Sequence, residues 1–167
     1  MSWIDDLSTA WDREYPDLDT KAFPPMVRLA RLSVLIEGFQ QEVLAPFELS
    51  SGDYGVLAAL RRAGEPYQLS PSKLYSRLER SSGGMTKILK RLEEAGLVVR
   101  SPDPRDGRGS VVSLSEEGLS LQERVFNAFL SATSDLLAPI SQSANDLLDT
   151  NRVLGNLLDT FETRFPR

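Results

Sequence analysis

Histidine and cysteine are both absent from this 167-residue chain. Their absence excludes a serine or cysteine nucleophile activated by histidine, a zinc or iron site with histidine ligands, and a disulfide framework. Carboxylates and lysine could still carry acid–base chemistry, but without histidine or cysteine we can nominate no convergent set of catalytic groups. We therefore expect no catalytic residue, no metal and no cofactor.

Long apolar runs are also missing. No stretch approaches the roughly 18 consecutive apolar residues that a membrane helix needs. Asp5 and Asp6 stand where a secretory signal would carry basic residues. The lack of cysteine fits a reducing compartment. We expect a cytoplasmic protein that does not bind membranes.

Basic residues are concentrated in one stretch of an otherwise acidic chain. The net charge is -5. Residues 71–109 nevertheless carry nine basic and five acidic side chains, so this segment is +4 and the remaining 128 residues are -9. A basic segment inside an acidic protein indicates a local binding site for a polyanion.

The residues before this segment predict helices with clear boundaries. Residues 24–44 open on two prolines, carry apolar residues at helical spacing, and stop before Pro46. The run 50–53 has the form of a capping box ahead of a second helix, which residues 64–66 end. Ser70-Pro71 predicts the start of a third, short helix.

The basic segment predicts one more helix followed by a β-hairpin. The run 81–84 predicts a turn, with Ser81 or Ser82 capping the next helix. That helix carries an apolar stripe at i, i+3, i+4 and i+7, formed by Met85, Ile88, Leu89 and Leu92. Runs 97–99 and 111–114 are β-prone, and residues 101–109 predict the loop between the two strands. Two short helices, a turn and a hairpin make a winged helix-turn-helix in a mainly α (α+β) protein.

Two further helices are expected after the hairpin. One starts at residues 115–117 and is interrupted by Pro139, and the other occupies most of the remaining chain. Their apolar stripes could form a core within the chain or pack against a partner. Because few helices are available to cover them, we favour burial against a second copy.

The outward face of the central helix is expected to bind duplex DNA. Thr86, Lys87, Lys90 and Arg91 remain exposed once the apolar stripe is buried, and the three cations share one face. Ser81, Ser82 and Gly83 stand at the helix start, where backbone N–H groups favour phosphate. Arg105 and Arg108 lie on the narrow hairpin loop, a shape that fits a minor groove.

Other interpretations of the same residues remain open. A cationic helix face and a charged loop tip are often merely solvated surface. A winged helix that binds protein instead of DNA is the rival function, and it would not need cations on both the helix and the loop. An enzyme is the third choice.

Runs within this segment resemble the MarR family of transcription regulators. Residues 78–98, LERSSGGMTKILKRLEEAGLV, resemble that family's recognition helix. Residues 100–109 and 111–118, RSPDPRDGRG and VVSLSEEG, resemble its wing and the helix start that follows. The resemblance extends over about residues 32–137. It implies a homodimer with interlocked terminal helices (about 1–47 and 115–167), a DNA-binding lobe (about 48–114), a pseudo-palindromic operator and a possible small-molecule effector.

The N-terminal residues resemble the urate-responsive branch of that family. Residues 11–19, WDREYPDLD, are similar to its extra N-terminal helix, and the resemblance assigns Trp11 and Arg100 to a ligand pocket. Gly55 and Ile88 stand where that branch has an aspartate and an arginine, so the pocket is expected to take a less anionic ligand than urate, or none. Trp11 could alternatively be a hydrophobic plug that packs the helix onto the dimer.

Overall fold

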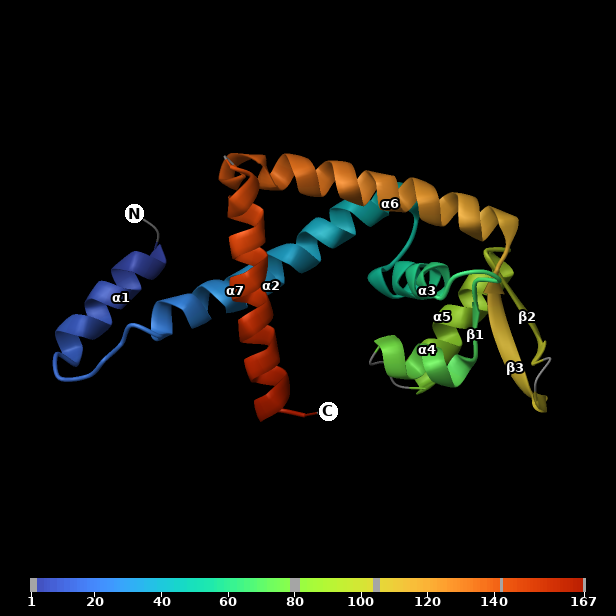
Figure 1. Cartoon of the computed structure of the whole chain (residues 1–167), viewed down its shortest axis with the longest axis horizontal. Coiled ribbons are helices and arrows are strands. Elements are labelled where there is room, and N and C mark those ends of the chain that lie inside the picture. Colours follow the sequence, from blue (N-terminus) through green and yellow to red (C-terminus); the bar gives the residue numbers. More distant parts are fainter. Residues whose placement is uncertain (1–2, 79–81, 104–105, 142, 167) are drawn as a thin grey trace. The chain divides into compact units, whose positions relative to one another are not determined.

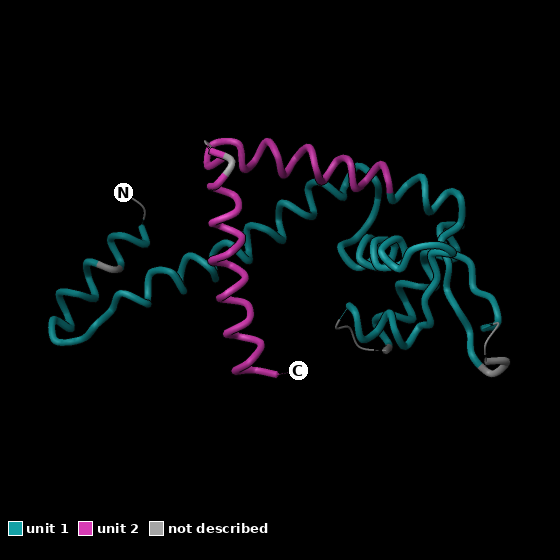
Figure 2. Tube along the Cα trace, viewed as in Figure 1, with its two compact units in different colours: residues 1–122 teal, residues 123–167 magenta. Residues whose placement is uncertain are grey.

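The computed structural model describes residues 3–78, 82–103, 106–141 and 143–166. Two compact units comprise residues 1–122 and 123–167 (Figure 2). The elements, labelled in Figure 1, are α1 (Trp3–Glu14), α2 (Phe23–Leu44), η1 (Ala45–Phe47), α3 (Ser51–Arg62), β1 (Gln68–Leu69), α4 (Pro71–Leu78), α5 (Ser82–Glu94), β2 (Val98–Asp103), β3 (Asp106–Leu114), α6 (Glu116–Leu137), η2 (Ala138–Ile140) and α7 (Ala144–Arg164). This order confirms the mainly α class with a small sheet. Among the described residues, no helix combines the length and apolar character needed to cross a bilayer.

The expected helix starts at three positions are confirmed. α2 begins beside its two prolines and ends at Leu44. At the start of α3, Ser50 Oγ accepts a hydrogen bond from the Asp53 backbone N–H, and the Asp53 side chain accepts one from the Ser50 backbone N–H. This reciprocal pair is the predicted capping box. α4 begins at Pro71, directly after Ser70.

The predicted turn before α5 is wrong for its two glycines. α5 begins at Ser82, so Gly83 and Gly84 lie in its first turn. Glycine in a helix costs only about 1 kcal/mol relative to alanine. Burial of Met85, which follows directly, offsets that cost by holding the turn against the core. Ser81 lies outside the described residues, so its capping role stays a prediction.

The sheet has three antiparallel strands in the order β1-β3-β2. The sequence predicted only β2 and β3. β1 pairs Gln68 with Ser113 and Leu69 with Val112. A two-residue strand is too short to show the alternation by which strands are identified in a sequence.

The hairpin loop predicted over residues 101–109 is too long. β2 continues to Asp103 and β3 begins at Asp106, so most of that segment is strand. Pro102 is compatible with β2 because this strand lies at the sheet edge, where a missing N–H donor is tolerated. The strand register shifts between Pro102 and Asp103.

One buried cluster joins α3, α4, α5 and the sheet. The predicted stripe of α5 is confirmed, since its four residues are at most 6% exposed. It packs with residues that include Val56, Leu57 and Leu60 from α3, Leu74 from α4, and Val98 and Val112 from the strands. This packing fixes which face of α5 turns outward.

The start of α6 is tied closely to the turn after α5. Ser115 Oγ donates to the Gly96 carbonyl over 2.7 Å and accepts from the Gly118 N–H over 2.9 Å. The Ser115 N–H donates to the Leu97 carbonyl over 3.1 Å. A Cβ atom on Gly118 would collide with that same carbonyl oxygen of Leu97. The approach of α6 to this turn therefore requires glycine.

Gly118→Ala is expected to lower the free energy of unfolding by about 2 kcal/mol or more, because the backbone of Leu97 must move. Urea denaturation followed by circular dichroism measures this loss. Gly83→Ala is the matched control, since a Cβ atom there meets nothing within 4 Å. Equal stability of the two variants would contradict the proposed steric requirement.

Candidate nucleic-acid interface

The outward face of α5 presents Thr86, Lys87 and Lys90, all exposed. Their exposure follows from burial of the opposite, apolar stripe. Lys90 Nζ lies 3.6 Å from Glu94 Oε1, and both side chains are largely exposed. A surface pair of this kind contributes little to stability and holds the ammonium group only weakly. Lys87 and Lys90 thus bring positive charge to one surface of the helix.

The first turn of α5 lies beside these cations. Gly83 is exposed there and leaves open space where a side chain would stand. The first N–H groups of a helix have no intrahelical acceptor, so an anion near them is favoured. Ser81 and the side chain of Ser82 lie outside what the structure describes.

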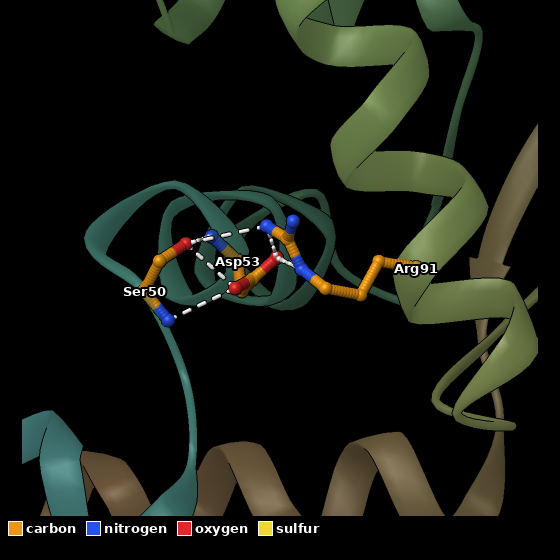
Figure 3. A network of polar contacts seen from close by, with 3 residues as sticks. All are labelled: Ser50, Asp53 and Arg91. Atoms are coloured by element: carbon orange, nitrogen blue, oxygen red, sulfur yellow. Dashed lines mark hydrogen bonds and ion pairs between the residues drawn. The ribbon is translucent and has the colours of Figure 1, made fainter.

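Arg91 contacts another part of the chain (Figure 3). Its guanidinium donates from Nε and Nη2 to Asp53 Oδ1, over 3.1 and 2.6 Å. Nη2 also lies 3.4 Å from Ser50 Oγ. The Asp53 side chain is 4% exposed, whereas that of Arg91 is about half exposed. Arg91 therefore joins the last turns of α5 to the first turn of α3.

Sequence reasoning recognised Ser50 and Asp53 only as capping residues. Asp53 Oδ2 accepts from the Ser50 N–H over 2.9 Å and from Ser50 Oγ over 2.6 Å, while Oδ1 accepts both bonds from Arg91. The carboxylate thus serves two helices at once. A separation of 38 residues between Asp53 and Arg91 gave no local signal of this pair.

The structure describes the side chain of Arg100 but not the side chains of the hairpin residues Arg105 and Arg108. Arg100 Nε lies 3.6 Å from Glu93 Oε2, which links β2 to α5. Arg108 lies in β3, but its side chain is outside the described part of the chain, and so is the whole of Arg105. Contacts of these two arginines with DNA remain predictions.

Trp11 belongs to an exposed aromatic cluster at the junction of α1 and α2. Its ring stacks on Tyr15 at 5.5 Å between centroids and meets Phe23 edge-on at 6.3 Å. A pocket of about 360 Å³ beside it is lined by Trp11, Tyr15, Leu18, Asp19, Thr20 and Phe23. Arg100 is not among the residues that line this pocket, and a ligand contact by Arg100 stays a prediction.

Tyr54 connects α3 to α6. Burial raises the pKa of its hydroxyl above 10.0, against the opposing effects of the Arg62 charge and a hydrogen bond with the Gln122 side chain. The hydroxyl therefore stays neutral at physiological pH. Gln122 is itself buried, so this contact lies within the packed part of the protein.

Comparison with known proteins assigns the chain to a family. Residues 47–109 match a model of the MarR family. The chain is 34% identical over 139 residues to the HTH-type transcriptional regulator PecS of Dickeya dadantii, covering 83% of this chain and 84% of PecS. It is 31% identical over 111 residues to the organic hydroperoxide resistance transcriptional regulator of Bacillus subtilis, covering 66% and 73% of the two chains. A crystal structure of a cysteine-to-serine mutant of E. coli MarR complexed with operator DNA has a TM-score of 0.67 at 25% identity, covering 85% of this chain and 99% of MarR. This protein belongs to the MarR family.

Proposed function

We propose that this protein is a sequence-specific DNA-binding transcription regulator, not an enzyme, which acts in the cytoplasm as a repressor. The observation that carries the proposal is the outward face of α5, where Lys87 and Lys90 stand opposite a buried stripe. The similarity to PecS, a transcriptional regulator, supports it over most of the chain. The E. coli MarR structure with operator DNA supports a duplex DNA partner.

The proposed DNA contacts fall into three groups. The start of α5, with Ser81, Ser82 and Gly83, takes a backbone phosphate. Thr86, Lys87 and Lys90 address the major groove from the helix face. Arg105 and Arg108 enter the adjacent minor groove from the hairpin. In this division residues 48–114 form the DNA-binding lobe.

Wild-type protein is expected to bind DNA from the region upstream of its own gene, with an affinity that falls steeply as salt rises. Lys87→Ala should weaken binding, because a cation that displaces counterions is lost. The slope of log K against log salt should fall by about 0.9 for each phosphate contact removed.

The double variant Arg105→Ala/Arg108→Ala should lose about 1–3 kcal/mol of operator-binding free energy in total. Fluorescence anisotropy across a salt series measures both effects.

Lys21→Ala is the control for this experiment. Its side chain is 92% exposed and, among the described residues, forms an ion pair with Asp19 at 3.9 Å, so operator affinity should stay unchanged. Weak binding that is identical for random DNA and for all variants would contradict DNA-specific function. That result would favour the rival function, a winged helix that binds protein instead of DNA.

We also propose that the protein works as a homodimer built from residues 1–47 and 115–167. The described helices of these segments expose large apolar side chains, which a second copy would cover. They include Leu32, Leu35 and Ile36 on α2, Phe126 and Leu130 on α6, and Leu154, Leu158 and Phe161 on α7. A dimer would also place two copies of α5 on a pseudo-palindromic operator.

Leu158→Asp is expected to shift the protein toward monomer, because association would bury an unpaired carboxylate. We expect a cost of roughly 3 kcal/mol or more in dimer stability, and weaker operator binding as a result. Sedimentation velocity over a concentration series measures the first effect. Asn156→Asp adds the same charge on the opposite side of α7 and should leave the dimer intact. A dimeric Leu158→Asp variant would remove this helix from the proposed interface.

We also propose that a small-molecule effector regulates DNA binding, with Trp11 and Arg100 as its candidate contacts. The aromatic pocket beside Trp11 supports a ligand with an apolar face. Gly55 and Ile88 lack the polar groups of the urate-responsive branch, which favours a less anionic ligand than urate. Binding would favour dimers whose two recognition helices do not match the half-site spacing. The absence of any small molecule that changes operator affinity at millimolar concentration would contradict regulation by an effector.

A further inference from the structure

We propose that Arg91 is a positioning residue for the recognition helix and does not contact DNA. This inference rests on the proposed DNA-binding function and revises one of the contacts that the sequence predicted. In place of a phosphate or base, the partner of Arg91 is the buried carboxylate of Asp53. The pair sets where the C-terminal half of α5 lies against α3.

The hydrogen bonds of Asp53 explain why Arg91 is held in place. An ionised carboxylate offers about four acceptor positions, and here all four receive a donor. Two come from the backbone and hydroxyl of Ser50, and two come from the guanidinium of Arg91. If Arg91 turned toward DNA, a 4% exposed carboxylate would lose its only cationic partner among the described residues. Separation of such a pair is strongly unfavourable.

The place of the pair along α5 gives it influence over DNA binding. Lys87 and Lys90 precede Arg91 by four residues and one residue on the same helix. Their positions in a major groove depend on the rotation and tilt of that helix. The apolar stripe can tolerate small rotations, whereas a two-donor contact with one carboxylate oxygen is directional. The ion pair thus restricts the orientation in which α5 presents its cations.

The test compares Asp53→Asn, Arg91→Gln and the double variant, using both operator DNA and random DNA. Asp53 is too buried to touch DNA, so a merely electrostatic view predicts that Asp53→Asn tightens binding by freeing a cation. A positioning role predicts the opposite. Each single variant should lose about tenfold or more in operator affinity, and the double variant should lose no more than the worse single variant. Affinity for random DNA should change little.

The salt dependence separates positioning from a phosphate contact. Arg91→Gln should leave the slope of log K against log salt unchanged, whereas loss of a phosphate contact lowers it by about 0.9. Arg91→Lys keeps the charge but loses the guanidinium donors, so it should not restore operator affinity. Urea denaturation establishes that each variant is folded. If Asp53→Asn does not fold, the two Arg91 variants still decide between the roles.

Two results overturn the inference. One is operator binding by Asp53→Asn that equals or exceeds wild type. The other is a reduced salt slope for Arg91→Gln with full affinity in Arg91→Lys, which would make Arg91 a phosphate contact. Failure of the wild-type protein to prefer operator over random DNA would instead count against the proposed function.

Discussion

The contact between Asp53 and Arg91 sets the constraint on which the proposed DNA-binding lobe depends. A buried carboxylate is stable only when charged or polar partners replace the water that it has lost. Asp53 meets this need through the start of its own helix, α3, and through the last turns of α5 (Figure 3). The same side chain therefore caps one helix and holds another. The contact between Asp53 and Arg91 thereby orients Lys87 and Lys90, the cations on the outward face of α5.

Apolar packing and the ion pair each fix a different aspect of the position of α5. Burial of Met85 and Leu89 decides which face of the helix turns outward. The hydrophobic effect that favours this burial is non-directional. The hydrogen bonds of Arg91 are directional and act at the other end of the helix. Ser115 and Gly118 then connect the end of this lobe to α6 through the carbonyls of Gly96 and Leu97.

The features predicted correctly from the sequence are those with a local cause. The capping box of α3 depends on residues three apart, and the stripe of α5 depends on one helical period. Features that depend on distant partners were missed. β1 depends on hydrogen bonds with the distant strand β3, and the contact between Arg91 and Asp53 joins residues that are 38 positions apart. The strands also run further into the segment 101–109 than its proline and glycine content suggested, since an edge strand tolerates Pro102.

A crystal structure of the protein bound to its operator would test the central claim most directly. The account predicts that Arg91 remains on Asp53 in the complex while Lys87 and Lys90 face the DNA. An Arg91 guanidinium on a phosphate or base edge, with the Asp53 carboxylate left without it, would contradict the account.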